Sequence, residues 1–269
     1  MPEIPEIASR AIEMNAELRG KTILNVEVLQ PKCLNIPTDE FSAALTGAEI
    51  KGTTFHGKWL ITDTSKGWFL LNLGMGGEIL LVTRQTLPEK RRLIFDFADS
   101  SALSINFWWF GYAHYMAANQ LPKHKMTALL GPNAMDVDVE GLRASIKGQR
   151  TKLKTFLLDQ SKVAGIGNAY IHDILFLAKL HPLRPLASLT DDEVINLQHA
   201  IHAGLQPSID KGGAFYEVNL HGQKGGFQVE DILIGYKEGQ PCPVCGTPIQ
   251  KIKTGIKTSS FICPVCQKL

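Results

Sequence analysis

Long hydrophobic runs are absent from the sequence, and none approaches the roughly 18 residues that a membrane-spanning helix needs. An excess of charge of one sign is also absent, because 28 basic residues face 26 acidic ones and leave a net charge of +2. A polyanionic partner would therefore have to be recognised through local patterns of charge. The first six residues carry acids where a secretory signal would be basic and then apolar, so we expect a cytoplasmic protein.

Cysteine is confined almost wholly to one region near the C-terminus. Four of the five cysteines form two Cys-x-x-Cys pairs, Cys242 with Cys245 and Cys263 with Cys266, separated by residues 246–262. Two such pairs at this spacing are typical of a tetrahedral four-thiolate zinc site. The alternative, two disulfides, needs an oxidising compartment that nothing in the sequence suggests. We therefore predict one structural Zn²⁺ that provides much of the folding free energy of a small zinc ribbon.

The region around these cysteines is basic, since residues 237–269 carry five lysines and a single acid. A hairpin carrying Lys251, Lys253 and Lys257 could lie against a phosphate backbone, and it could equally be a solvated strand face. This segment alone leaves both interpretations open. The fifth cysteine, Cys33, stands far upstream and is expected to be an ordinary core or surface residue.

The first half of the chain has the pattern of one helix followed by short strands. Apolar residues recur at helical spacing over residues 5–19, and Gly20 ends this pattern. Short β-rich runs separated by turn residues then follow at 23–28, 59–62, 68–71, 79–82, 93–97 and 103–107. This spacing predicts a β-sandwich or a barrel with a flanking helix.

The second half of the chain is predicted to be helical after a connector at residues 116–138. Helices are expected at 139–147, 151–160, 168–180 and 191–210, and Thr190 with Glu193 forms a capping box for the last of them. A glycine-rich stretch at residues 212–226 is a candidate mobile loop, although such stretches usually only connect elements. The fold class that we predict is multi-domain α+β.

A Gly-x-Gly turn lies within residues 163–168, between two predicted helices. The helical flanks disfavour a dinucleotide site, which needs a preceding strand. The turn could present backbone N–H groups to a phosphate, and it could be no more than a packing turn. The nearby Lys152, Lys154 and Lys162 favour contact with phosphate.

Seven parts of the chain together resemble one known family. They are Met1–Glu6, Gly57–Leu60, Leu73–Gly77, Leu157–Gln160, Gly165–Tyr170, His181–Pro185 and the two cysteine pairs. In this order they resemble the formamidopyrimidine-DNA glycosylase/endonuclease VIII family over the whole chain. The resemblance implies four parts with DNA in the cleft between domains: an N-terminal catalytic β-sandwich domain (1–120), a linker (121–138), a helix–two-turn–helix DNA-binding domain with a lesion-capping loop (139–226) and a zinc finger (227–269).

The resemblance also implies which residues are catalytic. The nucleophile of the family is the N-terminal proline, which is Pro2 here once Met1 has been removed. A terminal amine has a pKa near ~8, so part of it is neutral in the cell and can attack the sugar C1′. Glu3 is then the expected proton shuttle, and Lys58 the residue that holds phosphate and stabilises developing charge. Taken alone, Pro2 and Pro5 would be explained by the chemistry of a helix start.

Other positions match the DNA contacts of the family. Met75 matches a side chain that fills the space left when the target base leaves the stack. Asn168 and Lys154 are expected to bind phosphates near the flipped nucleotide. The loop at 214–226 corresponds to the loop that covers the flipped base in the purine-preferring branch, and Ile4 also favours that branch.

The chain departs from the family pattern in three places, one of which is Asn72, where a histidine is common. The family motif Asp-Pro-Arg-Arg-Phe-Gly is Asn-Phe-Trp-Trp-Phe-Gly here, so Trp108 and Trp109 replace both arginines, while Phe110 is kept. Trp108 can stack but offers a single hydrogen-bond donor. We therefore hypothesise that a stacking wedge replaces recognition of the opposite base by hydrogen bonds. In the zinc hairpin the family arginine is Thr258, and the adjacent Lys257 could replace it only if the hairpin is shifted.

The sequence therefore predicts a bifunctional DNA glycosylase and abasic-site lyase that removes oxidised bases, such as 8-oxoguanine or formamidopyrimidine, through a Schiff base on the N-terminal proline. The expected partner is double-stranded DNA with a damaged base or an abasic site. We expect a prokaryotic, nucleoid-associated monomer with no membrane contact. The alternatives are a catalytically weakened relative that binds damaged DNA and a glycosylase for oxidised pyrimidines. A generic zinc-ribbon protein that binds RNA or protein would leave the N-terminal motif unexplained.

Overall fold

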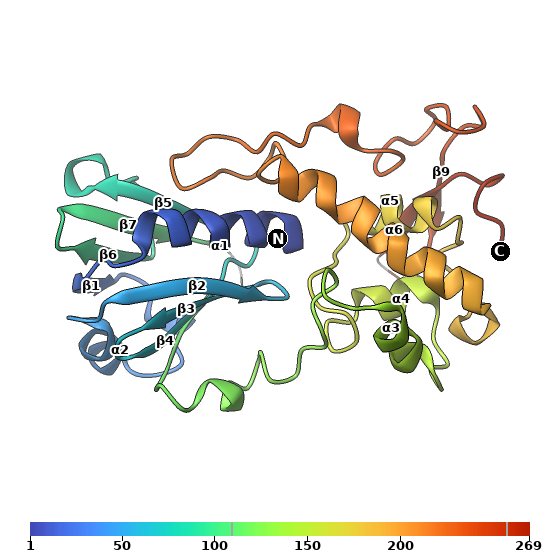
Figure 1. The fold of residues 1–269 in the computed structure, drawn as a ribbon. Coiled ribbons are helices and arrows are strands. Elements are labelled where there is room, and N and C mark those ends of the chain that lie inside the picture. Colours follow the sequence, from blue (N-terminus) through green and yellow to red (C-terminus); the bar gives the residue numbers. More distant parts are fainter. Residues whose placement is uncertain (109, 257) are drawn as a thin grey trace. The chain divides into compact units, whose positions relative to one another are not determined.

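The computed structural model describes residues 1–108, 110–256 and 258–269, which form two compact units (Figure 1). The first unit contains Met1–Leu129 together with Lys211–Gly226. The second contains Leu130–Asp210 together with Phe227–Leu269. The chain therefore returns to the first unit for one short segment before it completes the second.

Two four-stranded antiparallel sheets build the first unit, with strand orders β1-β6-β7-β5 and β2-β3-β4-β8. The strands are β1 (Ile23–Val28), β2 (Ile50–His56), β3 (Trp59–Thr64), β4 (Gly67–Asn72), β5 (Glu78–Thr83), β6 (Leu93–Phe97), β7 (Ser101–Asn106) and β8 (Tyr112–Met116). Phe69 of one sheet and Phe95 of the other have ring centroids 4.8 Å apart within one continuous apolar core. The predicted β-sandwich is confirmed.

Helix α1 (Ile4–Leu18) lies alongside β2 and closes this core (Figure 1). Its first turn is fixed by a capping box, in which the backbone N–H of Glu3 donates to Oε2 of Glu6 at 2.8 Å. Ile7 and Met14 lie about two helical turns apart on the same face of α1, and both are buried in the core. The helix predicted over residues 5–19 is therefore present and begins one residue earlier.

Helices dominate the second unit. They are α3 (Val139–Ile146), α4 (Leu153–Leu158), α5 (Ile171–Leu177) and α6 (Asp191–Asp210). Helices α5 and α6 pack closely, because a Cβ added to Gly204 would lie 2.7 Å from Cγ1 of Ile174. The predicted capping box of α6 is present, with Thr190 N–H donating to Oε2 of Glu193 at 2.8 Å and Glu193 N–H donating to Oγ1 of Thr190 at 3.2 Å.

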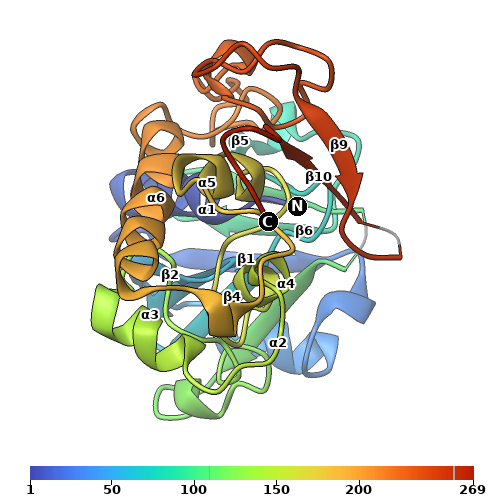
Figure 2. The same ribbon diagram turned by 90° about the vertical axis from the view of Figure 1, so that its right-hand side faces the viewer.

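The C-terminal part of this unit is a two-stranded ribbon of β9 (Gln250–Lys253) and β10 (Ser259–Ile262), drawn in red in Figure 2. Its small core joins Ile249 and Phe261 to Phe176 of α5 and to two of the cysteines. The remaining short elements are α2 (Thr38–Leu45) and the 3₁₀ turns η1 (Pro31–Cys33), η2 (Arg84–Thr86), η3 (Leu121–Lys123), η4 (Leu186–Ser188) and η5 (Val229–Asp231). Among the residues that the structure describes, no helix combines the length and apolarity needed to span a bilayer.

Candidate functional site

Four thiols converge at the base of the ribbon. The Sγ atoms of Cys242, Cys245, Cys263 and Cys266 all lie within 4.8 Å of one another, and none of them forms a disulfide. The Cys245–Cys263 and Cys242–Cys266 pairs have Sγ–Sγ distances of 3.4 and 3.9 Å. A tetrahedron of Zn–S bonds of ~2.3 Å has sulfur–sulfur edges of ~3.8 Å. The donor set and its spacing therefore fit one structural zinc.

The first residues of the chain are buried at the start of α1, in the first unit. Pro2 is buried, and Glu3 is 4% exposed at the N-cap position. Glu6 holds this region together, because its Oε2 accepts from Glu3 N–H and its Oε1 accepts from the backbone N–H of Ala214 at 3.3 Å. Met1 remains half-exposed, so its removal leaves Pro2 as the chain terminus without disturbing a packed side chain.

Lys58 stands in the turn between β2 and β3 and is half-buried. Burial lowers the pKa of its amine, while the charges of Glu3 and Glu6 act in the opposite direction. Those interactions show that Lys58 shares one charged region with the start of α1. The turn is fixed by Asn72, whose Nδ2 donates to the carbonyl of Lys58 at 3.0 Å and whose Oδ1 accepts from the backbone N–H of Gly74 at 3.0 Å.

The structure brings Met75 and Trp108 together from two separate loops of the first unit. Glu78, the first residue of β5, pairs with Asn106, the last residue of β7. The loop that precedes β5 and the loop that follows β7 therefore lie at the same end of this strand pair. The backbone N–H of Trp108 donates to the carbonyl of Met75 at 3.2 Å. A Cβ added to Gly76 would lie 3.2 Å from the Trp108 ring, so the indole packs directly over this glycine.

Three large apolar side chains are exposed on these loops: Met75 (52%), Trp108 (63%) and Phe110 (68%). Phe110 also has a positive φ of 56°, a conformation that costs free energy in a non-glycine residue and is often found at functional sites. Exposed apolar residues gathered in this way are unusual on a soluble domain, and they suit insertion between bases. We call Met75, Trp108 and Phe110 the apolar wedge.

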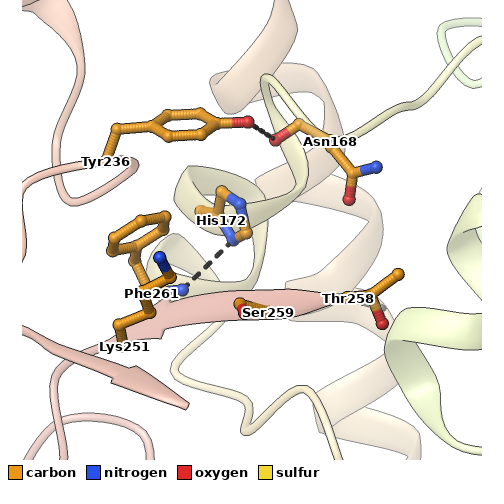
Figure 3. A pocket seen from close by; sticks show the side chains of 7 residues that line it. All are labelled: Asn168, His172, Tyr236, Lys251, Thr258, Ser259 and Phe261. Carbon is orange, nitrogen blue, oxygen red and sulfur yellow. Dashed lines mark hydrogen bonds between the residues drawn. The ribbon is translucent and has the colours of Figure 1, made fainter. Parts of the chain in front are cut away.

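Asn168 borders a pocket of about 320 Å³ in the second unit (Figure 3). Its other lining residues are His172, Tyr236, Lys251, Thr258, Ser259 and Phe261. The Tyr236 hydroxyl donates to the carbonyl of Asn168 at 3.2 Å. His172 Nδ1 accepts from the backbone N–H of Phe261 at 3.4 Å, and burial lowers the pKa of His172 to about 3, so its ring is neutral. Because His172 is neutral, Lys251 is the lining residue that brings positive charge to this pocket.

Lys154 lies in α4 and points to the ribbon. Its Nζ donates to the carbonyl of Ser259 at 2.5 Å and to Oγ1 of Thr254 at 3.4 Å, and the residue is 3% exposed. Burial lowers the pKa of its amine to about 8. Lys154 thus links α4 to the ribbon, and its expected contact with DNA stays a prediction. Lys257 and Trp109, which the sequence also singled out, lie outside the described residues.

Two residues of the first unit were not singled out by the sequence patterns. Arg10 of α1 is 4% exposed and donates to the carbonyl of Val218, while Glu217 lines a small cavity together with Pro2 and Glu6. The contacts join segments more than 200 residues apart. Neither residue belongs to a motif. Their roles become visible only from the spatial contacts between α1 and the glycine-rich segment.

Comparison with known families gives three matches along the chain. The model described as formamidopyrimidine-DNA glycosylase N-terminal domain matches residues 1–107. The formamidopyrimidine-DNA glycosylase H2TH domain matches residues 130–219, and the zinc finger found in FPG and IleRS matches residues 239–269. The zinc-finger match and the four-thiol cluster confirm the prediction of a structural zinc.

Individual proteins are similar over the full length. The formamidopyrimidine-DNA glycosylase of Chloroflexus aurantiacus is 33% identical, with 99% of this chain and 98% of the relative covered, and that of Sodalis glossinidius is 32% identical, with 99% and 100% covered. Among solved structures, the Lactococcus lactis Fpg bound to DNA containing N7-benzyl-Fapy-dG has a TM-score of 0.91 at 29% identity, covering 100% of both chains. The same protein bound to DNA with an abasic site has a TM-score of 0.91 at 28% identity, covering 99% of this chain and 100% of that chain.

Proposed function

Because the chain belongs to the formamidopyrimidine-DNA glycosylase family, a family of base-excision-repair DNA glycosylases, we propose that it excises oxidised bases from double-stranded DNA and then cleaves the backbone at the abasic site. Lyase activity and a proline nucleophile are typical of this family. The observation that carries the proposal is the grouping of Pro2 and Glu3 at the capped start of α1 with Lys58, on which the charges of Glu3 and Glu6 act.

The chemistry begins at the nitrogen of Pro2 after Met1 has been removed. A terminal amine with a pKa near ~8 is partly neutral near neutral pH, so its lone pair can attack C1′ of the damaged nucleotide. The base leaves with the electron pair of its bond to C1′. An iminium between the proline nitrogen and C1′ then forms as the nitrogen loses its proton and the C1′–O4′ bond breaks, with O4′ keeping that electron pair. This iminium makes the C2′ proton acidic, and its loss breaks the bond to the 3′ phosphate by β-elimination.

Glu3 and Lys58 assist these steps in the proposal. Glu3 adjoins the nucleophile, and its carboxylate can move protons to and from the sugar. Lys58 binds the neighbouring phosphate and stabilises negative charge as it develops. Both side chains are partly or fully removed from solvent, which strengthens their electrostatic effect.

DNA binding is assigned to two groups of residues. The apolar wedge of Met75, Trp108 and Phe110 fills the gap that the flipped nucleotide leaves in the stack. Phosphate contacts are assigned to Asn168 and Lys154, which the family pattern places near the flipped nucleotide, and to Lys257, which is adjacent to the position of the family arginine. Lys251 is added to this set, because it supplies charge in the pocket that Asn168 and Thr258 border.

The preferred lesions are proposed to be oxidised purines such as 8-oxoguanine and formamidopyrimidine. This preference follows the names of the relatives and the structure of a mutant of the Lactococcus lactis Fpg bound to Fapy-dG DNA. A second substrate class, oxidised pyrimidines, is favoured by a specific observation: the same Lactococcus lactis protein has been solved with DNA containing an oxidised pyrimidine. Excision from matched duplexes carrying each class of lesion separates the two.

The protein is proposed to act as a cytoplasmic, nucleoid-associated monomer. The functional parts that we propose are the catalytic domain (1–120), the linker (121–138), the DNA-binding domain with its lesion-capping loop (139–226) and the zinc finger (227–269). Within the third part, the loop at 214–226 hydrogen-bonds to α1 of the first unit.

The test is reductive trapping on a duplex with one abasic site. Zinc-loaded protein without Met1 should become covalently linked to the sugar when borohydride is present. A preparation of the same chain that retains Met1 is the matched control, because its Pro2 nitrogen is an amide and cannot form an iminium. DNA binding by trimmed protein without any adduct would contradict the proposal and favour a damaged-DNA-binding relative.

A further inference from the structure

The segment at residues 214–226 is a closed hairpin in this structure. The backbone N–H of Asn219 donates to the carbonyl of Gln223 at 2.8 Å, and that of Gly225 donates to the carbonyl of Glu217 at 3.1 Å. The side-chain oxygen of Asn219 accepts from the backbone N–H groups of His221 and Gln223, both at 2.9 Å. The hairpin therefore carries its own hydrogen bonds and holds Glu217 in a defined place.

Helix α1 and strand β5 fix the hairpin within the first unit. Arg10 donates to the carbonyl of Val218 and to Glu13, and the Glu13 carboxylate accepts from the backbone N–H of Leu220 at 2.9 Å. The carbonyl of Leu220 in turn accepts from the backbone N–H of Leu81 at 2.8 Å, and the Leu220 side chain is fully buried. Helix α1 and strand β5 therefore both bind the backbone of residues 218–220.

The fixed hairpin places the carboxyl of Glu217 beside the start of the chain. Glu217 and Pro2 line one cavity of about 10 Å³, close to the least volume that a single water needs. Glu6, Arg10 and Glu78 line the same cavity. Groups this closely packed can exchange a proton directly or through one water molecule.

The charges around Glu217 decide its protonation. From α1 it faces Glu6 and Arg10, from β5 it faces Glu78, and it also interacts with the N-terminal ammonium group, which is that of Met1 in this structure. Burial and the charge of Glu6 raise the pKa of Glu217 to about 7, while the ammonium group and Arg10 act in the opposite direction. A terminal amine has a pKa near ~8, so a proton can pass between the two groups at a cost of only about tenfold in population.

We propose that Glu217 is a further acid–base residue of the glycosylase/lyase reaction and accepts the N–H proton of Pro2 during iminium formation. The inference rests on the proposed function. When the neutral nitrogen bonds to C1′, it becomes positively charged and still carries its hydrogen. The N–H bond then breaks, the proton goes to a Glu217 oxygen, and the freed electron pair forms the C=N bond as the C1′–O4′ bond breaks and O4′ leaves with the electron pair of that bond.

This role differs from that of Glu3, which serves the sugar side of the reaction. A secondary amine must lose its only hydrogen before a C=N bond can form, so a base on the nitrogen side is a separate requirement. Glu217 meets it from a hairpin that Arg10 and Glu13 hold in place. Arg10 is accordingly a positioning residue, since it acts through the hairpin.

The test is the rate of borohydride-trapped adduct formation in single turnover on an abasic-site duplex, measured against pH for trimmed, zinc-loaded protein. In the unaltered protein the rate should fall as the pH drops through the neutral range for two reasons, because a protonated Pro2 amine cannot attack and a protonated Glu217 cannot accept the proton. Glu217→Gln should slow adduct formation by about 10²-fold above neutral pH, and it should remove the ionisation of Glu217 from the profile while the ionisation of the amine remains. Glu217→Asp should recover part of the rate together with the ionisation.

The matched control is Glu89→Gln, which neutralises an exposed acid of the same unit and should leave rate and profile unchanged. DNA affinity and melting temperature, measured on each variant, separate loss of a base from loss of the hairpin. A Glu217→Gln profile that runs parallel to that of the unaltered protein, or a rate within about threefold of it, would overturn this inference alone. Absence of any adduct from the unaltered protein would overturn the proposed function and this inference together.

Discussion

The backbone N–H of Trp108 donates a hydrogen bond to the carbonyl oxygen of Met75, with 3.2 Å between nitrogen and oxygen. This bond joins the loop after β7 to the loop before β5, so it links the two segments that carry the apolar wedge. Trp108 occupies a position where the family pattern has an arginine. The indole packs over Gly76 and leaves most of its surface exposed, so it offers an apolar face for stacking in place of the hydrogen-bonding group of an arginine.

The first prediction concerns the base opposite the lesion. Because Trp108 stacks without reading a base edge, excision of one lesion opposite each of the four bases should vary by less than about tenfold in the unaltered protein. Trp108→Arg should introduce a preference among opposite bases. Trp108→Ala should weaken binding to lesion duplex by about tenfold or more, as loss of one stacking contact does. Strong discrimination in favour of cytosine by the unaltered protein would contradict the stacking role.

The second prediction concerns Asn72, which bonds both the carbonyl of Lys58 and the backbone N–H of Gly74. Asn72→Ala should lower the free energy of unfolding by about 1–2 kcal/mol, because two backbone groups lose a partner. It should also slow adduct formation, because the turn that carries Lys58 is released. Asn25→Ala, which removes an exposed side-chain hydrogen bond to Asp96, is the control. Equal adduct rates for the two variants would show that Asn72 does not position Lys58.

The third prediction concerns the zinc. Cys245→Ser should abolish stoichiometric zinc binding and weaken DNA affinity, because the ribbon and its Lys251 lose their order. The N-terminal residues are untouched, so adduct formation at saturating DNA should survive. Cys33→Ser is the matched control, since Cys33 is a buried thiol outside the zinc cluster. Unchanged DNA affinity in zinc-free Cys245→Ser would remove the ribbon from the DNA-binding surface.

The fourth prediction concerns acid stability. His114 Nδ1 and His124 Nε2 lie 2.7 Å apart, and both rings are buried against Trp59. Burial and the neighbouring His124 lower the pKa of His114 to about 4, whereas a histidine of the unfolded chain titrates near ~6.5. The unfolded state therefore binds more protons between these values, and stability should fall as the pH drops through this window.

Melting temperatures at about pH 7 and about pH 5 test this sign. His114→Gln should reduce the loss of melting temperature between the two conditions. His221→Gln, which alters an exposed histidine paired with Glu17, should behave like the unaltered protein. An equal loss in all three proteins would assign the acid sensitivity to other groups.

Local signals were sufficient for the elements whose patterns are strong. Helix α6 begins and ends at the predicted residues, since the capping box of Thr190 and Glu193 marks its start. Strands β1 and β6 likewise match their predicted ranges. Three elements were not predicted as separate units: α2, β2 and β8. Helix α2 has only two turns, β2 contains Gly52, and β8 carries His114. The periodicity of apolar residues is therefore weak in each of these elements.

The site was predictable only where a motif marks it. Pro2, Lys58 and the cysteines belong to motifs with recognisable spacing. Glu217 and Arg10 belong to none, and their relation depends on pairing between segments that are distant in sequence. The composition of the glycine-rich segment at 212–226 predicts a candidate mobile loop, because it does not reveal that Arg10 and Glu13 bind the backbone of this segment.

The most direct measurement is identification of the nitrogen that carries the trapped sugar. Trimmed, zinc-loaded protein is reduced with borohydride on an abasic-site duplex, digested, and analysed by mass spectrometry. The sugar remnant should be found on the N-terminal peptide, attached to the nitrogen of Pro2. Attachment to Lys58 or another lysine, or no attached sugar at all, would contradict catalysis by the terminal proline.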